Sequence, residues 1–313
     1  MISRGYGIGV DLGGTSIIIG LFDIKGNMLE KTIIPTDRSD NGSHILGDIQ
    51  QAVKDFYREK GISRDEILGI GIGVPGPVLA DGTVNKCVNM GWGVINVREE
   101  LEEMLNIPVY VMNDGDVAAL GEKWQGAAKG CKNIFMVEFG TGVSGGIVKK
   151  GLPVVGNNGS AGEFGHICVN PYETAVCTCG NKGCLEQYTS STGIMRHAKK
   201  HYGDKFIDVK DIYDHAKEGD EDALETVEWT SDYMGRGLAA IACVLDPECI
   251  IIGGGIAKAG EFMIDHIRPY FEKYAFHAQR GKIDLRLAQL SQEAAVYGAV
   301  GRVFDALQIE EEF

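Results

Sequence analysis

One histidine and three cysteines carry the most specific chemical signal in the sequence. His166 is followed by Cys177, Cys179 and Cys184, and one imidazole with three thiolates is a typical tetrahedral ligand set for Zn²⁺. The opening residues do not resemble a signal peptide, so we expect a cytoplasmic metal site rather than disulfides. Free thiols in a loop are the alternative. Cys168 is a further thiol that could compete for the fourth ligand position.

Three glycine turns follow strand-like segments, at residues 13–15, 140–142 and 253–255. Backbone N–H groups in such turns can point at an anion, and Thr15 and Thr141 add hydroxyl groups. A single turn of this kind is usually only a turn, but three in one chain favour a site for a nucleoside triphosphate. The G-x-G-x-x-G match at 71–76 does not indicate a dinucleotide-binding fingerprint, because it is interrupted and followed by prolines.

A neighbouring amide and carboxylate form the second candidate site. Asn113 and Asp114 lie between a predicted strand, which ends at residue 112, and a predicted helix over 117–124. Asp114 either caps that helix or reaches a substrate hydroxyl as the general base that phosphoryl transfer requires. Glu163 and Glu186 flank the Cys–His segment, and both are acceptors that can bind sugar hydroxyls.

The elements that must position these residues are those of an α/β protein. Apolar spacing predicts amphipathic helices, and β-rich runs bounded by glycine predict strands. Val10–Thr15 and Val137–Gly142 also echo one another, each with a β residue, an acid, an apolar residue and a glycine turn. We therefore expect two similar lobes, 1–112 with 294–313 and 113–293. Helices are predicted at 45–57, 97–105, 117–124, 186–201, 209–217, 221–245, 258–274 and 294–306, and strands at 68–74, 108–112, 249–252 and 283–288.

Composition narrows the class of partner. The 313 residues include 44 glycines, about twice the usual share, and carry a formal net charge of −14. Such an acidic surface is unsuited to wrapping nucleic acid, and no apolar run approaches the length of a membrane span. The glycines are therefore expected in tight turns and where backbone approaches a ligand closely.

In these motifs the sequence resembles the ROK family of bacterial sugar kinases and related repressors, specifically its glucokinase branch. The resemblance covers nearly the whole chain, and its Cys–His segment is the most family-specific part. It rests on motifs that occur in the expected order: Asp11–Thr15, Gly73–Pro77, Asn89 with Gly91-Trp92, Asn113-Asp114 with 118–122, Gly140–Gly142, Glu163 with His166, Cys177–Glu186, and Leu245–Glu248 before Gly253–Gly255.

The resemblance implies a two-lobed actin/hexokinase-like (ribonuclease H-like) fold with an interdomain cleft, and an ATP-dependent hexose kinase. Asp114 would be the general base for the sugar 6-hydroxyl. The sugar would be bound by Gly76, Asn113, Asp114, Glu163, His166 and Glu186. Phosphates would be cradled by Gly13, Gly14, Thr15, Thr141 and Gly142, Mg²⁺ would be placed with the help of Asp11, and adenosine would be bordered by Gly254 and Gly255. Structural Zn²⁺ would be held by His166, Cys177, Cys179 and Cys184.

Some positions depart from the family pattern, namely Val88, Met90, Gly115, Asp116 and Ser144. None removes a catalytic group, but they weaken any inference about which hexose fits. Glucose is the first expectation, with N-acetylglucosamine, N-acetylmannosamine, mannose or fructose as alternatives. The family also implies a homodimer.

Two other classes of function remain as alternatives. A sugar-sensing repressor would carry a DNA-binding helix-turn-helix before the first glycine turn, and only ten residues precede Asp11. A catalytically silent sugar-binding protein would have lost Asp114 or a phosphate turn, and both are present.

Overall fold

The computed structural model describes residues 5–87 and 90–307, so Val88, Asn89 and the acidic tail 310–312 lie outside the described residues. The chain divides into two compact units. The first comprises 1–130, 146–161 and 292–313, and the second comprises 131–145 and 162–291. This division groups the helix that follows Asn113 with the first unit, whereas the expected boundary placed it in the second lobe. The physical reason is that this helix packs mainly on the C-terminal helix.

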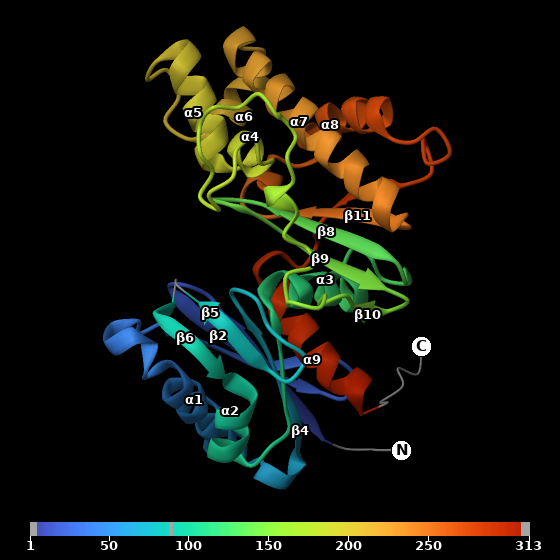
Figure 1. The fold of residues 1–313 in the computed structure, drawn as a ribbon. Coiled ribbons are helices and arrows are strands. Elements are labelled where there is room, and N and C mark those ends of the chain that lie inside the picture. The colour runs from blue at the N-terminus through green and yellow to red at the C-terminus, as the bar shows by residue number, and fades with distance from the viewer. Residues whose placement is uncertain (1–4, 88–89, 308–313) are drawn as a thin grey trace. The chain divides into compact units, whose positions relative to one another are not determined.

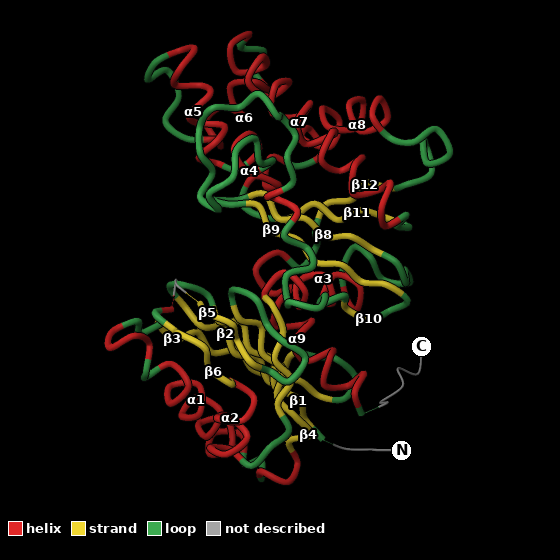
Figure 2. The backbone as a smooth tube through the Cα atoms, viewed as in Figure 1, coloured by secondary structure: helices red, strands yellow, loops and turns green. Residues whose placement is uncertain are grey.

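A five-stranded mixed sheet forms the centre of the first unit, in the order β3-β2-β1-β4-β7 (Figure 2). Helices α1 and α2 pack together beside it (Figure 1), and α9 packs on β1 and β4 with α3 against it. The elements are β1 (Tyr6–Leu12), β2 (Ser16–Asp23), β3 (Met28–Pro35), α1 (Ile45–Lys60), β4 (Ile67–Val74), the small sheet of β5 (Thr83–Cys87) and β6 (Trp92–Asn96), α2 (Val97–Leu105), β7 (Val109–Asn113), α3 (Asp114–Gln125) and α9 (Ala294–Ala306).

The two faces of this sheet differ sharply in side-chain size. In β1 and β4 large apolar residues alternate with glycine, and successive residues of a strand point to opposite faces. Ile8, Val10, Ile70 and Ile72 belong to the same core cluster as the buried residues of α1 and α2. The alternate positions, Gly7, Gly9, Gly69, Gly71 and Gly73, face α9 and α3.

Helix α9 lies directly on this glycine-lined face. A Cβ on Gly9 would lie 2.2 Å from the carbonyl oxygen of Val296, and a Cβ on Gly71 would lie 1.8 Å from that of Ala299. Helices α9 and α3 also touch backbone to backbone, since a Cβ on Gly298 of α9 would lie 1.7 Å from the carbonyl oxygen of Val117 in α3. The high glycine content is therefore used in part for helix packing, and not only for turns.

The second unit repeats the arrangement of the first. Its sheet has the order β10-β9-β8-β11-β12, in which β11 is parallel to both β8 and β12, just as β4 is parallel to β1 and β7. The predicted echo is thus confirmed at the level of topology. The strands of this sheet are β8 (Ile134–Phe139), β9 (Val143–Lys149), β10 (Leu152–Pro153), β11 (Cys249–Gly253) and β12 (Asp284–Leu287). The division into units assigns β10 and the part of β9 from residue 146 onward to the first unit. The helices are α4 (Glu186–Thr189), α5 (Ser191–Tyr202), α6 (Val209–Lys217), α7 (Glu221–Leu245) and α8 (Glu261–Tyr274).

Helix ends follow local capping chemistry. Asp208 and Asp220 cap α6 and α7 by accepting a hydrogen bond from the backbone three residues on. The single helix predicted over 186–201 is wrong, because Ser190 adopts an extended conformation and caps a new helix, α5. The helix predicted from Lys258 is also interrupted, since Gly260 has a φ of 77°.

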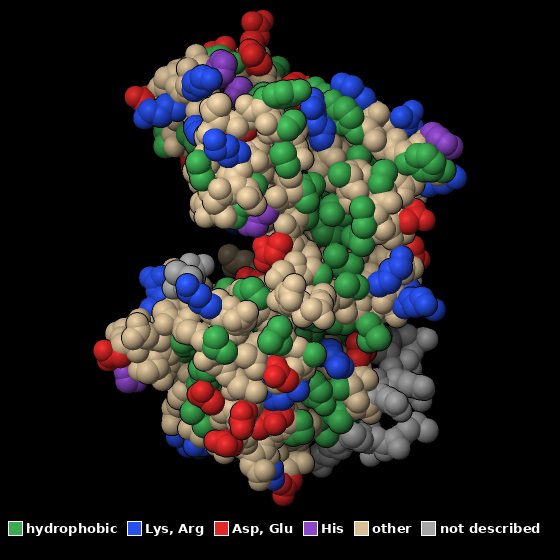
Figure 3. Space-filling model, in the orientation of Figure 1, with side chains coloured by type: hydrophobic (Ala, Val, Ile, Leu, Met, Phe, Trp, Pro, Cys, Tyr) green, Lys and Arg blue, Asp and Glu red, His purple; other side chains and the backbone are tan. Residues whose placement is uncertain are grey.

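The surface of the first unit carries acidic side chains in the region of α2 (Figure 3), where Glu99, Glu100 and Glu103 are exposed. Within residues 5–87 and 90–307, none of the helices combines the length and the apolar character that crossing a bilayer requires.

The close contact of α9 with α3 makes a direct prediction. Gly298→Ala should lower the free energy of unfolding by at least about 2 kcal/mol, because the new methyl group overlaps backbone atoms that cannot move aside. Gly47→Ala is the matched control, since Gly47 lies in α1 and no described atom lies within 4 Å of its Cβ position. That variant should gain about 0.5–1 kcal/mol from helix propensity. Urea denaturation measures both, and equal stability of the two variants would contradict the packing described.

Candidate functional site

The parallel strands of the first unit bring three predicted segments to one sheet edge. In the register of the sheet Asp11 lies beside Gly73, and Gly73 lies beside Met112. All three strands run in the same direction, so the residues that follow them meet at the same edge. Asp11, the turn containing Gly76 and the pair Asn113-Asp114 therefore lie together, as expected.

Asn113 caps α3, and Asp114 is the first residue of that helix. The side-chain oxygen of Asn113 accepts a hydrogen bond from the amide of Gly115 at 2.8 Å, and its Nδ2 donates to the carbonyl oxygen of Gly76 at 3.0 Å. The latter bond holds the turn after β4, where Gly76 has a φ of 99°. Asp114 Oδ1 accepts from the Gly115 amide at 2.9 Å. Asn113 is therefore the N-cap of α3, the role that the sequence analysis gave as one alternative for Asp114.

Asp11 lies on the glycine-lined face of the first sheet, next to Asp114. Burial, together with the negative charge of Asp114, raises the pKa of Asp11 from 3.8 to about 7. Both causes disfavour the charged form, because a buried carboxylate loses water and two carboxylates repel each other. A cation bound at this edge would favour the ionised form of Asp11.

The first glycine turn joins β1 to β2 and leaves its tip open. The Gly13 amide donates to the carbonyl oxygen of Ser16, and the Thr36 hydroxyl donates to the carbonyl oxygen of Gly13 at 2.7 Å. Thr15 is exposed, and no described atom lies within 4 Å of a Cβ placed on Gly14. The turn therefore has a fixed base and an accessible end.

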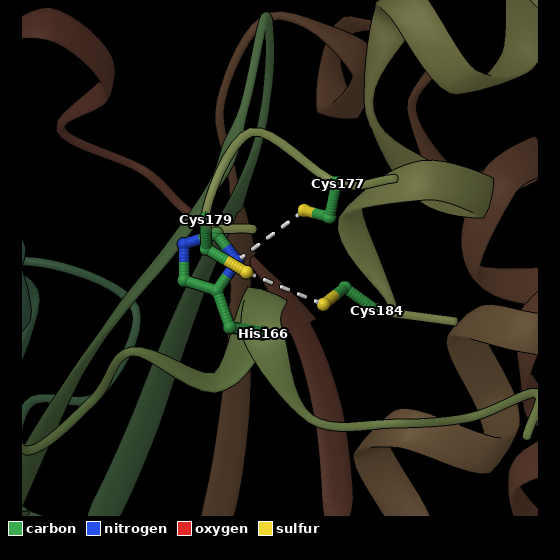
Figure 4. Close-up of side chains that lie close together, drawn as sticks. All are labelled: His166, Cys177, Cys179 and Cys184. Carbon is green, nitrogen blue, oxygen red and sulfur yellow. Dashed lines mark hydrogen bonds between the residues drawn. The ribbon is translucent and has the colours of Figure 1, made fainter. Parts of the chain in front are cut away.

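The second unit brings the four predicted metal ligands together. The donor atoms of His166, Cys177, Cys179 and Cys184 all lie within 4.8 Å of one another, and the four side chains point toward a common centre (Figure 4). His166 Nδ1 lies 3.8 Å from Cys177 Sγ, and the sulfurs of Cys179 and Cys184 lie 3.6 Å apart. Tetrahedral zinc with bonds of about 2.3 Å to sulfur separates two sulfurs by about 3.8 Å. The residues present therefore fit such a metal ion.

Cys168 is not part of that group among the residues described. It pairs with Cys184 through a backbone bridge, and its sulfur lies 3.2 Å from the position of a Cβ on Gly183. Cys168 packs against the loop of the metal ligands rather than joining them.

His166 presents one ring nitrogen to the thiols and the other to Glu163. Its Nε2 lies 3.9 Å from Glu163 Oε2, and the two side chains are 30% and 48% exposed. Both residues come from a short 3₁₀ segment (Phe164–His166) and its preceding cap position. Both side chains are therefore partly accessible to a polar ligand.

Glu186, the first residue of α4, contacts two segments at once. Its Oε2 accepts a hydrogen bond from the amide of Val143 at 3.0 Å, and its Oε1 accepts one from the hydroxyl of Thr178 at 3.0 Å. Neither Thr178 nor the Val143 amide was predicted as part of the site. Local sequence held no signal for them, because the contacts join positions far apart in the chain.

The other two glycine turns follow β8 and β11. Thr141 and Gly142 are exposed, and the Gly140 amide donates to the carbonyl oxygen of Gly142. Gly254 has a φ of 85°, and a Cβ there would lie 2.4 Å from the carbonyl oxygen of Phe139, so the third turn lies against the end of β8. Gly255 has open space around its Cβ position within the described residues.

The family profile, a sequence relative and a solved structure each match nearly the full length of this chain. The profile of the ROK family matches residues 7–304. The glucokinase of Halalkalibacterium halodurans is 38% identical over 312 residues, which cover 95% of this chain and 94% of that protein. A solved structure of a ROK family glucokinase from Streptomyces griseus, in complex with glucose and AMPPNP, has a TM-score of 0.76 and 32% identity, and covers 95% of this chain and 98% of its own.

A regulator is also among the relatives. The xylose repressor of Caldicellulosiruptor bescii is 29% identical over 95% of this chain, and the match covers 77% of that repressor.

The expected actin/hexokinase-like fold class is confirmed by the similarity to the glucokinase structure from Streptomyces griseus.

The raised pKa of Asp11 predicts how stability depends on pH. The folded protein holds the Asp11 proton more tightly than the unfolded chain, so its contribution to stability is complete below pH 3.8 and is lost as the pH rises through about 7. Asp11→Asn removes this loss. Without divalent cations, the variant should be more stable than the wild type at pH 8 by up to about 4 kcal/mol, and the difference should shrink toward pH 4. Urea denaturation at several pH values measures this, with the exposed Asp65→Asn as control. A difference independent of pH would contradict the assignment.

Proposed function

The chain belongs to the ROK family, and from this premise we propose that it transfers the γ-phosphoryl group of ATP to the 6-hydroxyl of a hexose, with glucose as the preferred sugar. The observation that carries the proposal is the near full-length similarity to glucokinases, one of which is solved with glucose and AMPPNP. The carboxylates of Asp11 and Asp114 on one sheet edge support it, because phosphoryl transfer needs a base and a cation site.

In the first unit, Asp114 is proposed as the general base. Its carboxylate accepts the proton of the sugar 6-hydroxyl as that oxygen attacks the γ-phosphorus. Asn113 and Gly76 are proposed to bind the sugar, and the hydrogen bond between them fixes their spacing. The first glycine turn, with Gly13, Gly14 and Thr15, is proposed to bind phosphate oxygens through backbone amides and the threonine hydroxyl.

Asp11 is proposed to help bind Mg²⁺, which neutralises charge on the transferring phosphoryl group when it is bound with ATP. The raised pKa of Asp11 supports this role, because a carboxylate beside a second carboxylate is stabilised by a divalent cation.

In the second unit, Glu163, His166 and Glu186 are proposed to bind sugar hydroxyls. His166 is suited to this because its Nδ1 faces the cysteines while Nε2 remains on the side of Glu163. Thr141 and Gly142 are proposed to bind phosphate, and Gly254 and Gly255 to border the adenosine. The exposure of all four residues supports these roles.

The metal held by His166, Cys177, Cys179 and Cys184 is proposed to be structural Zn²⁺. Four protein ligands leave no position for a reactive water, and coordination of Nδ1 would fix the orientation of the imidazole. We further propose a cytoplasmic homodimer that binds neither nucleic acid nor membranes. The regulator alternative is less favoured, because identity to the glucokinase is higher and the match spans more of that protein.

A coupled assay with ATP tests the proposal and resolves the choice of hexose. Glucose, mannose, fructose and the two N-acetylhexosamines are compared with Mg²⁺ present, and polyphosphate is compared with ATP as the donor. We expect turnover with glucose to exceed that with the other sugars. Absence of turnover with every sugar would reject the kinase, and sugar-responsive binding to operator DNA would favour the regulator.

Asp114→Asn should separate binding from catalysis. The amide keeps the shape of the side chain but cannot accept the proton, so kcat should fall on the order of a thousandfold, while glucose binding measured by calorimetry should be retained. The exposed Asp265→Asn serves as the control and should keep full activity. Substantial turnover by Asp114→Asn would mean that another group is the base.

Metal analysis tests the proposed zinc site. The purified protein should contain one zinc ion per chain. Cys184→Ser should lose it and unfold at a lower temperature, because structural zinc contributes folding free energy. Cys168→Ser should keep the metal, since Cys168 lies outside the ligand group. Equal zinc loss in both variants would contradict the ligand assignment.

A further inference from the structure

The carboxylate of Glu186 joins the loop of metal ligands to the second glycine turn. One oxygen accepts from the hydroxyl of Thr178, which lies between two of the cysteines, and the other accepts from the amide of Val143, which follows the turn. The turn also leaves no room for a side chain at this point, because a Cβ on Gly142 would lie 2.8 Å from Glu186 Oε2. Glu186 is therefore held from both sides.

We propose that Thr178 is a positioning residue for the phosphoryl donor. Its hydroxyl fixes the orientation of Glu186, and Glu186 in turn fixes the glycine turn at residues 140–142. This inference rests on the proposed function, in which that turn binds phosphate. Thr178 itself touches neither reacting group in this account.

The bond from the Val143 amide to Glu186 holds a part of the 140–142 turn that its other hydrogen bonds do not hold. Its internal bond runs from the Gly140 amide to the carbonyl oxygen of Gly142, and the Gly140 carbonyl accepts from the amide of Ser191 at 2.7 Å. These bonds hold the start of the turn. The end of the turn is held by the bond from the Val143 amide to Glu186.

Charge gives a second reason for fixing this carboxylate. A phosphate group bound at the turn and the Glu186 carboxylate repel each other, and the repulsion grows as they approach. With both oxygens bonded, the carboxylate stays beside Val143. Loss of the Thr178 hydroxyl frees Oε1, whose other polar neighbour among the described residues is Cys177 Sγ at 4.0 Å. As a thiolate ligand of the proposed zinc, that sulfur would donate no hydrogen bond. The carboxylate can then rotate toward the phosphate site.

The test compares Thr178→Val with Thr178→Ser, which retains the hydroxyl. AMPPNP binding with Mg²⁺ is measured by calorimetry, and exchange of the Val143 amide is measured by NMR. Thr178→Val should weaken AMPPNP binding roughly three- to tenfold, the range expected for the loss of one typical hydrogen bond, and should speed Val143 exchange. Thr178→Ser should restore both values. Thr174→Val, an exposed threonine of the same segment, is the matched control and should leave both unchanged.

Unchanged AMPPNP affinity or unchanged Val143 exchange in Thr178→Val would overturn the inference. Zinc content and thermal unfolding are measured on each variant, and Thr178→Ala replaces Thr178→Val if the latter loses metal or fails to fold. A wild-type protein that binds no nucleotide and phosphorylates no hexose would reject the proposed function instead. The amide-exchange comparison would still test the contact between Thr178, Glu186 and Val143.

Discussion

The glycine-lined face of the first sheet is the constraint on which the candidate catalytic edge depends. Because alternate residues of β1 and β4 lack side chains, the backbone of α9 lies directly on the sheet, and α3 packs on α9. Gly73 extends the same face to the sheet edge, where a Cβ would lie 2.4 Å from Val117 Cγ2 and 3.7 Å from Asp114 Cα. The start of α3 is therefore close to β4, the strand paired with β1, and Asp114 lies near enough to Asp11 for their charges to interact. A larger residue at Gly73 would force the helix and its carboxylate away from the strand.

The second sheet has the same strand order as the first, but different side chains gather beside its glycine turn. Its first strand also ends in a glycine turn, but the segment that follows β9 and β10 carries the Cys–His cluster. There, the loop of the Cys–His cluster and the side chain of Glu186 provide the positioning that packed helices provide in the first unit. Repetition of one topology thus supplies two glycine turns at equivalent positions, between β1 and β2 and between β8 and β9, while the segments attached to them differ in chemistry.

Sequence reasoning predicted those features that depend on nearby residues. The helices over 97–105, 209–217, 221–245 and 294–306 have the predicted bounds, because apolar spacing is strong there and Asn96, Asp208 and Asp220 give clear caps to three of them. The Cys–His cluster was predicted from residue types and spacing alone. The break at Ser190 was missed because apolar spacing continues across it, although Ser190 itself is a typical N-cap residue.

Contacts between distant segments lay beyond local sequence patterns. Spacing does not reveal that Glu186 reaches Val143, or that α9 uses the glycines of β1, because both depend on how strands and helices pack. The start of α3 was placed three residues late for a related reason: Gly115 disfavours a helix, but the Asn113 cap and the packing of α3 on α9 outweigh that preference. The preferred hexose is equally inaccessible to local patterns, because it depends on the shape of a pocket.

The central claim is that the fold places Asp11 and Asp114 close enough for their charges to interact. The most direct test is an NMR titration of the Asp11 carboxyl carbon in the metal-free protein, in the wild type and in Asp114→Asn. The account predicts a pKa of about 7 for Asp11 in the wild type, and a lower value in the variant, because the neighbouring negative charge is gone while burial remains. An Asp11 that titrates near 4 in the wild type, or at the same pH in both proteins, would contradict it.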